Sequence, residues 1–393
     1  MKPGKAVPVI KVLLLDGHTV QALSVLKALK NTGYFITVFC ESKISYGYTS
    51  RYPDKKVICP AIKKNESDFL SFLKSYLALY PHDVIIPLFD NSAVVLNEHR
   101  KEFDQSGIKI ALPGYDLFRL ASNKSVLMKF CRDNGFPHPS TEDLNTDNLR
   151  KACETVGFPA LIKPVSSSGA NGIVYINSVN ELEKVFYRIE KQFGSAILQK
   201  YVEHEGFYFN AMLFRDYSGN FSKTVIIKIK RYFPTKGGTG SFSETVENEE
   251  IESMCKSILT CLDWHGFADF DLIIDKFTKN PRLIEINPRI PACIHASLAA
   301  GINFPMMIVN DALRKSLPDS EYRTNIKIRY FAMDFLWFIF SRERFRSNPS
   351  WFKFRDKDLF YQDGCNEILP MISGIFMGLR KYMSKEYRQS KLQ

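Results

Sequence analysis

Short apolar runs separated by amphipathic stretches characterise the first third of the chain. Four of these runs have the length and composition of buried strands: 12–16, 35–40, 82–90 and 107–113. Between the first two, residues 19–33 carry apolar side chains at helical spacing and end at a glycine. Strands that alternate with helices are typical of a parallel, doubly wound sheet. The pattern therefore predicts a Rossmann-like domain over residues 1–116. The turn after the first strand reads D-G-H-T and lacks the dinucleotide fingerprint G-x-G-x-x-G.

After residue 116 the elements no longer alternate. Residues 123–137 predict an amphipathic helix that ends near a glycine. Seven apolar runs follow, with polar turns between them: 158–164, 172–177, 196–202, 207–214, 222–233, 269–275 and 282–289. The first two flank a loop rich in serine and glycine and predict a hairpin, while the last two predict a strand pair. This mixed order is typical of an α+β domain, which we place at residues 117–318.

The remaining residues, 319–393, mix aromatic runs with charge, and basic side chains outnumber acidic ones by 14 to 9. Each apolar piece is too short to span a bilayer. We expect this C-terminal extension to cover the sheet of the second domain. The alternative is that residues 371–383 lie in a lipid headgroup layer, although Pro370 and Gly374 disfavour a strong helix there.

The composition is that of a globular protein: 45% of the 393 residues are hydrophobic and 24% are charged. The eight cysteines form no C-x-x-C pair, which indicates free thiols in a reducing compartment. We find neither a secretory signal nor a run of 18 apolar residues, so we expect a cytoplasmic protein without a transmembrane segment. The net charge of +11 is spread along the chain and accompanies no nucleic-acid-binding motif, so we expect no nucleic-acid partner.

A single cation ends the buried-looking run 158–162. Lys163 is followed by a proline, three serines and two glycines, so the loop has little side-chain bulk. Backbone N–H groups of such a loop can approach an anion closely, and a lysine adds a point charge suited to phosphate. The lysine precedes the glycines, which is not the order of a P-loop. The loop predicts a phosphate site, with a plain surface hairpin as the alternative.

Two carboxylates interrupt the last two apolar runs of this domain. Asp271 and Glu285 each lie in mid-strand, and a short turn between the strands would place them opposite each other. Asn287, two residues beyond Glu285, faces the same side. Three oxygen ligands suit Mg²⁺ that also binds substrate phosphates, and unpaired carboxylates inside apolar strands are costly. We therefore predict a nucleotide–Mg²⁺ site. The alternative is that Asp269 and Asp271 are solvent-facing charges at a sheet edge and that Glu285 is paired with a lysine.

Taken in order, these segments resemble the ATP-grasp superfamily, which includes carboxylate–amine ligases, biotin carboxylase and the large subunit of carbamoyl-phosphate synthase. The resemblance covers about residues 10–318. Its first portion, with "SRYPDKKVICP" and "DVIIPLFDNSA", looks like the family's pre-ATP-grasp domain. Its core carries "NKSVLMKFCRDNGFPHPST", "FPALIKPVSSSGANGI", "ILQKYVE", "GFADFDLIID" and "LIEINPR". The resemblance implies an α/β Rossmann-like pre-ATP-grasp domain followed by an α+β ATP-grasp fold.

The resemblance also implies contacts to the nucleotide. Lys124 and Lys163 match the family's two phosphate-contacting lysines. Residues 166–172 match its flexible lid over the phosphates. The lid residues expected to contact nucleotide are Ser167, Ser168, Gly169 and Gly172. The hinge whose backbone binds adenine is matched by Gln199, Lys200, Tyr201 and Val202. Ile284 matches the apolar residue under the adenine ring.

The remaining matches concern the metal, the ribose and the reacting groups. Asp271, Glu285 and Asn287 match the metal ligands, with Asp269 as the alternative to Asp271. Arg289 matches an arginine that faces the reacting carboxyl or phosphate group. Many members follow the hinge with G-x-E, whose glutamate holds the ribose, whereas this chain has E-H-E-G. Glu205 is therefore the ribose candidate and Glu203 its alternative.

The function implied by the resemblance is ATP-dependent ligation of a small-molecule carboxylate to an amine or ammonia. ATP with Mg²⁺, or with Mn²⁺ in its place, would form an acyl phosphate, and the amine would displace phosphate. Lys163 and Arg289 are the expected catalytic residues. One alternative is an enzyme similar to carbamoyl-phosphate synthase that acts on bicarbonate. The other is an ATP-binding or membrane-surface protein with little turnover. A homodimer and peripheral membrane contact are further expectations.

Overall fold

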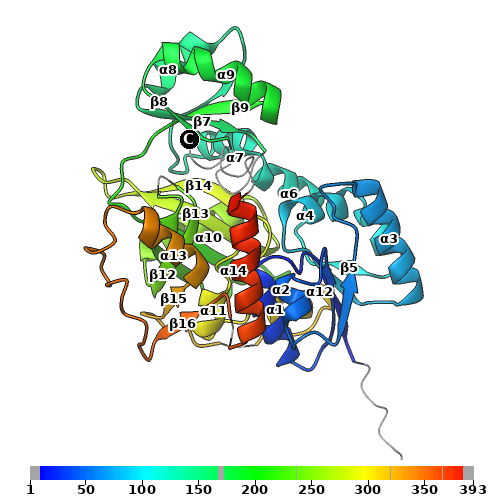
Figure 1. The fold of residues 1–393 in the computed structure, drawn as a ribbon. Coiled ribbons are helices and arrows are strands. Elements are labelled where there is room, and N and C mark those ends of the chain that lie inside the picture. Colours follow the sequence, from blue (N-terminus) through cyan, green and yellow to red (C-terminus); the bar gives the residue numbers. More distant parts are fainter. Residues whose placement is uncertain (1–8, 167–171, 236, 319, 365, 384–393) are drawn as a thin grey trace, which may run out of the picture. The chain divides into compact units, whose positions relative to one another are not determined.

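The computed structural model describes residues 9–166, 172–235, 237–318, 320–364 and 366–383 (Figure 1). Contacts divide the chain into two compact units, neither of which is one continuous segment. The first unit comprises Met1–Leu112, Arg289–Glu321 and Tyr361–Met377. The second comprises Pro113–Pro288, Tyr322–Phe360 and Gly378–Gln393. The boundaries that we placed at residues 116 and 318 follow sequence order and stay predictions.

A parallel sheet organises the first unit, as the alternating pattern predicts. Its order is β3-β2-β1-β4-β5, and each adjacent pair is parallel. The strands are β1 (Lys11–Leu14), β2 (Phe35–Cys40), β3 (Lys55–Ile58), β4 (Val84–Ile86) and β5 (Lys109–Ile110). The strand order reverses between β1 and β4. In open α/β sheets, ligands bind beyond the carboxyl ends of the strands at such a switch point.

Helices from all three segments complete the first unit. They are α1 (Gln21–Lys30), α2 (Tyr46–Thr49), α3 (Glu66–Leu79), α4 (Asp90–Glu98), α5 (Arg100–Gln105), α11 (His295–Ala299), α12 (Phe304–Ala312) and most of α14 (Ile368–Met383). Helix α1 contacts both α11 and α12. At the first of these contacts Ser24 Oγ lies 3.0 Å from His295 Nδ1, and both side chains are buried. The late segments are therefore part of the first unit's core.

The second unit contains a small antiparallel sheet of order β6-β9-β7-β8. Its strands are β6 (Thr141–Leu144), β7 (Ala160–Pro164), β8 (Val174–Ile176) and β9 (Ala196–Lys200). Helices α8 (Leu149–Val156) and α9 (Val179–Phe193) pack their apolar side chains on it. Ser178 caps the N-terminus of α9, because its side chain accepts from the Glu181 N–H. Strands β7 and β8 are the hairpin that the sequence predicts around the serine-glycine loop.

A larger sheet of order β14-β13-β10-β11-β12-β15-β16 forms the rest of this unit, and adjacent strands are antiparallel from β14 to β15. Its strands are β10 (Tyr208–Arg215), β11 (Val225–Phe233), β12 (Thr239–Val246), β13 (Gly266–Ile274), β14 (Pro281–Asn287), β15 (Lys327–Arg329) and β16 (Leu359–Tyr361). The associated helices are α6 (Tyr115–Ser122), α7 (Lys124–Asp133), α10 (Glu249–Cys261) and α13 (Phe331–Phe340). The predicted mixed α+β order is confirmed.

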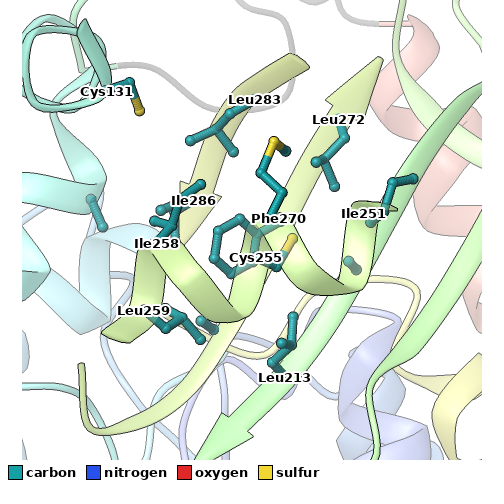
Figure 2. Packing of buried hydrophobic residues seen from close by; sticks show 14 of the residues in the cluster. Cys131, Leu213, Ile251, Cys255, Ile258, Leu259, Phe270, Leu272, Leu283 and Ile286 are labelled. Atoms are coloured by element: carbon teal, nitrogen blue, oxygen red, sulfur yellow. The ribbon is translucent and has the colours of Figure 1, made fainter. Parts of the chain in front are cut away.

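Helix α10 covers one face of this sheet (Figure 2). Its side chains in the core are Ile251, Met254, Cys255, Ile258 and Leu259. They pack on Phe270 and Leu272 of β13 and on Leu283 and Ile286 of β14. Because side chains alternate along a strand, the intervening polar residues of β13 must face the opposite side of the sheet. The packing of this core therefore determines which face carries the charged residues.

The C-terminal extension divides between the two units. Helix α13 contacts β11 and β12, and Phe233, Trp337 and Trp351 form a buried cluster, so this portion covers the large sheet as expected. Residues Tyr361–Met377 instead belong to the first unit, where the Glu367 carboxylate accepts from Ser50 Oγ at 2.7 Å. In the described part of the chain, no helix has the length and apolar character needed to cross a membrane.

Helix α14 forms despite the two residues expected to disfavour it. Pro370 is its third residue, where the missing N–H has no helical acceptor to lose. Gly374 is needed for close packing, since a Cβ atom there would lie 2.1 Å from the hydroxyl oxygen of buried Tyr46. The hydroxyl of the neighbouring Ser373 donates to the Ile44 carbonyl oxygen. The helix is therefore fitted to the first unit.

Gly374→Ala is expected to destabilise the protein by about 1–3 kcal/mol, because an overpacked contact outweighs the helix propensity gained. The matched control is Gly378→Ala, where a Cβ atom has no described neighbour within 4 Å. That change should stabilise the helix by up to about 1 kcal/mol. Thermal-unfolding midpoints of the two variants should therefore move in opposite directions. A Gly374→Ala protein at least as stable as the wild type would contradict this packing of α14.

Candidate functional site

A β-bulge places the carboxylate of β14 on the polar face of the sheet. Asp271 pairs with Glu285, whereas the next residue, Leu272, pairs with Leu283, so Ile284 is an extra residue. Without the bulge, alternation from the core residue Leu283 would direct Glu285 into the core. With it, the side chains of Asp271 and Glu285 share the face opposite α10. The sequence predicted this pairing but not the bulge.

Amide groups hold the carboxylates of this face in place. Asp269 pairs with Asn287 across the two strands, and Asn287 Nδ2 donates to Asp269 Oδ2 at 3.1 Å. Asn210 on β10 donates through Nδ2 to Asp269 and, at 3.1 Å, to Oδ1 of Asp271. Asp269 is only 1% exposed, whereas Asp271 is partly exposed. This favours Asp271 over Asp269 as the residue able to reach a ligand.

Two buried lysines flank the same carboxylates. Lys124 begins α7, and its Nζ lies 3.3 Å from Oε2 of Glu285. Lys163 lies in β7 and donates from Nζ to Oε1 of Gln199 at 2.6 Å. The two lysines are 8% and 5% exposed. Buried lysines are rare unless they are paired, and both of these have a polar partner: Glu285 for Lys124, which bears out the pairing of Glu285 with a lysine that we gave as the alternative, and Gln199 for Lys163.

The charged side chains of this group shift one another's pKa values. Burial lowers the pKa of Lys163 to about 8, helped by the charge of Lys124 and opposed by Glu285 and Asp271. Burial also raises the pKa of Asp271 well above its usual range, and the neighbouring Glu285 and Asp269 raise it further. Burial acts in the same direction on Glu285, but Lys124 and a hydrogen bond from Asp271 outweigh it and lower its pKa. The pKa values of these two neighbouring carboxyl groups thus shift in opposite directions, upward for Asp271 and downward for Glu285.

This donor set fits a divalent metal ion. The carboxyl groups of Asp271 and Glu285 are paired across two strands, which concentrates negative charge that a cation can neutralise. Asn287 donates from Nδ2 to Asp269, so the Oδ1 atom of Asn287 points away from Asp269. Carboxylate and amide oxygens are the ligands that Mg²⁺ takes beside phosphates. In the ranges that the structure describes, no three His, Cys, Asp or Glu side chains form a metal cluster by themselves.

At the predicted hinge, the backbone is partly engaged by neighbouring strands. The N–H groups of Lys200 and Tyr201 donate to the carbonyl oxygens of Ser140 and Pro159, at 2.8 and 3.0 Å. Within the described residues, the N–H of Val202 has no acceptor. Of the hinge residues, Val202 is therefore the one whose N–H remains available to a base.

The hinge side chains have structural partners. Gln199 is 2% exposed and links Lys163 to Thr141, donating from Nε2 to Thr141 Oγ1 at 3.0 Å. Lys200 donates from Nζ to the Phe158 carbonyl oxygen at 2.6 Å. The Gln199 side chain thus positions a predicted phosphate contact, a role that the sequence reasoning did not assign to it.

Neither ribose candidate is distinguished by its contacts. Glu205 is exposed and accepts from Lys279 Nζ at 2.8 Å, and this hydrogen bond lowers the pKa of the glutamate. Glu203 contributes its carbonyl oxygen to the Lys276 N–H at 2.8 Å. Ile284, the predicted adenine contact, is the extra residue of the bulge and is partly exposed.

Most of the predicted lid lies outside the described residues. Ser167, Ser168 and Gly169 belong to this undescribed part of the loop. Gly172, at its end, has φ of +74°, and a Cβ atom there would lie 2.7 Å from Pro164 Cγ and 2.9 Å from the Phe193 ring. Both the left-handed backbone and the close approach require glycine at this position.

Arg289 lies in the first unit, at the switch point of the parallel sheet. Its guanidinium donates to both carboxylate oxygens of Asp90, which begins α4 directly after β4. Asp16, after β1, accepts from the N–H groups of Leu88 and Phe89 at 3.0 Å each, which joins the two strand ends. Strand β14 ends at Asn287, so strand alternation does not extend to Arg289. That Arg289 faces the same side of the sheet as Asn287, toward the reacting carboxyl or phosphate group, stays a prediction.

The sequence reasoning missed two residues with evident structural roles at these sites. Asn210 bridges Asp269 and Asp271, and its signal was a lone polar residue inside the apolar run 207–214. Asp90 pairs with Arg289, and the sequence analysis placed it at the end of the predicted strand 82–90 without assigning it a role. The same pattern that identified Glu285, a polar side chain in mid-strand, would have found Asn210.

Comparison with known proteins shows which proteins this chain is similar to. A family model described as an ATP-grasp domain matches residues 121–293. The formate-dependent phosphoribosylglycinamide formyltransferase of Ignicoccus hospitalis is 29% identical over 226 residues, which are 53% of each chain. The D-aspartate ligase of Enterococcus faecium is 22% identical over 266 residues, 62% of each chain. The chain thus spans somewhat more than half the length of these curated relatives.

The fold agrees with these matches. The biotin carboxylase of Campylobacter jejuni, in its beta-gamma-ATP complex, has a TM-score of 0.67 at 17% identity and covers 80% of this chain, with 74% of its own length matched. At this identity the likeness shows the fold alone, and it confirms the predicted fold class. Residues 121–293 thus match an ATP-grasp domain, and the fold of the chain is similar to that of this biotin carboxylase.

Proposed function

We propose that the protein is an ATP-dependent ligase that joins a small-molecule carboxylate to an amine or ammonia through an acyl phosphate, with ADP and phosphate as products. The observation that carries the proposal is the pair of buried lysines, Lys124 and Lys163, beside the paired carboxyl groups of Asp271 and Glu285. Cations and acidic oxygen donors at one place suit a phosphate chain together with a divalent metal.

The protein would contribute position and charge rather than a nucleophile. Lys124 and Lys163 would neutralise the oxygens of the transferring phosphoryl group, and Gln199 would hold Lys163 in place. Asp271, Glu285 and Asn287 would hold Mg²⁺, or Mn²⁺ in its place, which when bound stabilises negative charge developing on the phosphate oxygens. Arg289, whose guanidinium donates to Asp90, would steady the anionic carboxyl or phosphate group.

The nucleotide would lie with its base against the hinge. The Val202 N–H would donate to the base, Ile284 would contact the ring, and Glu205 would accept from the ribose. Lid residues Ser167, Ser168, Gly169 and Gly172 would approach the phosphates. The names of the relatives, a formyltransferase and a D-aspartate ligase, support attack of an amine on an activated carboxyl group. In the described chain, seven cysteines are free thiols, which supports a cytoplasmic location.

The nucleotide product tests this proposal. We expect ADP and phosphate, with no AMP, when the protein turns over with ATP, Mg²⁺ and the correct carboxylate. Hydroxylamine should trap the acyl phosphate as a hydroxamate, so a panel of amino acids, hydroxy acids and sugar acids can be screened without knowing the amine. Chromatography of the nucleotides then decides the mechanism. Stoichiometric AMP with pyrophosphate would overturn it, because that product places the attack at the α-phosphorus.

A further inference from the structure

A cluster of three buried charges lies behind the aromatic part of the C-terminal extension. Arg231 and Arg329 both pair with Asp334, and all three side chains are at most 2% exposed. One carboxylate thus faces two guanidinium groups. Rings compensate for part of the excess charge: the guanidinium carbon of Arg231 lies 4.1 Å from the centroid of Phe242, and that of Arg329 lies 5.2 Å from the centroid of Phe354.

The two arginines also hold the loop that follows α13. Arg231 Nη1 donates to the Pro349 carbonyl oxygen and Arg329 Nη2 to the Trp351 carbonyl oxygen, each at 2.9 Å. The Trp351 indole N–H donates back to the Asp334 carbonyl oxygen at 3.0 Å. Bonds to buried charged donors are among the stronger hydrogen bonds in proteins. The loop is therefore anchored at its middle.

Phenylalanines on this anchored loop face solvent. Phe345, Phe352 and Phe354 are 75%, 55% and 40% exposed, and we call these three residues the phenylalanine patch. Their rings are continuous with the buried ones: Phe345 lies 6.3 Å from Phe352, and Trp351 lies 5.5 Å from Phe352 and 5.0 Å from Phe354. Adjacent large apolar groups in water on an anchored loop indicate an interaction surface.

The segment that carries the phenylalanine patch is rich in basic residues. Between residues 342 and 357 there are six basic residues and two acidic ones, Glu343 and Asp356. Asp356 is already engaged by Lys327 and Lys353, at 2.8 and 2.9 Å. The segment therefore carries a net positive charge, and we call its six basic residues the basic rim. We therefore expect the patch to bind a partner that has an apolar interior and an anionic surface.

We propose that the phenylalanine patch and its basic rim bind the surface of an anionic lipid bilayer. Phenyl rings would enter the headgroup–acyl boundary while arginines and lysines meet the lipid headgroups. A second copy of the chain is disfavoured because two such rims would repel each other. Ile339 and Phe340 on α13 are also exposed, at 44% and 45%, and they add to the apolar surface. Because the aliphatic side chain of Ile339 cannot stack on a nucleic-acid base, it favours lipid over nucleic acid as the partner. The site is distinct from residues 371–383.

Vesicle binding of the full-length protein tests the proposal. It should co-sediment with vesicles of phosphatidylcholine mixed with phosphatidylserine, and not with phosphatidylcholine alone. The double variant Phe345→Ser/Phe352→Ser should bind at least about tenfold more weakly, because it removes two exposed rings. The matched control Phe277→Ser alters a phenylalanine that is 73% exposed elsewhere in the same unit and should bind like the wild type.

A charge variant makes the test independent of the phenylalanines. Arg342→Gln/Arg346→Gln should weaken binding about fivefold for each charge removed, and added salt should weaken the wild type further. Lys184→Gln/Lys191→Gln, which removes two exposed charges from α9, is the matched control. Wild-type protein that ignores phosphatidylserine vesicles, or patch variants that bind as tightly as the wild type, would overturn the proposal. So would a dimer or a single-stranded nucleic-acid complex that forms through the patch in place of vesicle binding.

Discussion

Replacing Glu285 by glutamine should lower turnover by roughly a thousandfold or more while the protein remains folded. The change preserves the shape of the side chain but removes the charge that lies 3.3 Å from Lys124 Nζ. It also removes the neighbour that raises the pKa of Asp271, so that Asp271 should ionise more readily. The proposed metal site would then have one carboxylate where the reaction needs two. Phosphate release with the carboxylate identified by hydroxamate trapping measures the effect.

The control for this substitution is Glu183→Gln, which removes a partly exposed carboxylate of α9 that pairs with Arg150. Its turnover and thermal-unfolding midpoint should both match the wild type. ATP binding without turnover in Glu285→Gln would agree with a role in catalysis. Normal turnover in that variant would remove Glu285 from the site, even if the nucleotide products remain ADP and phosphate.

The second large effect is expected at Lys163. Lys163→Met keeps the length and the apolar stem of the side chain but removes its charge, so the variant should fold. Loss of a cation beside the phosphates should raise the KM for ATP by roughly tenfold. It should also lower kcat by roughly a hundredfold at saturating ATP, because the charge matters most when the phosphoryl group is in transfer. Lys184→Met is the matched control on the same unit.

Initial rates over a range of ATP concentrations separate the two effects. A variant whose rate recovers fully at high ATP would show that Lys163 contributes to binding only. A variant with wild-type KM and kcat would reduce the serine-glycine loop to a plain surface hairpin. Binding of ADP measured by calorimetry gives an independent readout, because it does not depend on finding the carboxylate substrate.

Two strand pairs, β7–β8 and β13–β14, were predictable because burial is visible as apolar runs in the sequence, whereas the strands β3, β6, β12, β15 and β16 were not predicted. Apolar runs identified both strands of the β13–β14 pair, and a polar residue inside each run identified Asp271 and Glu285. The parallel sheet followed from the alternation of strand-like and helix-like segments. These features depend on residues close together in the chain, which is why a pattern of apolar and polar positions is enough to find them.

Features that depend on distant contacts were not predictable in the same way. The bulge at Ile284 changes the phase of alternation by one residue, and no local signal in "RLIEINPR" marks it. The pairing of Arg289 with Asp90 joins residues 199 positions apart. Docking of α14 requires the match between Gly374 and Tyr46, which only the folded chain reveals.

The first unit, which is built from three separated segments, has a consequence for the order of synthesis. Its parallel sheet is complete at Leu112, but the segment Tyr361–Met377 emerges from the ribosome roughly 250 residues later. At usual elongation rates that interval is on the order of ten to fifty seconds. His295, the partner of Ser24, and Glu367, the partner of Ser50, are synthesised much later than α1 and α2. The surfaces of these helices therefore stay uncovered until then. A newly made chain therefore exposes these surfaces longest, and it is there that a chaperone has the most time to bind.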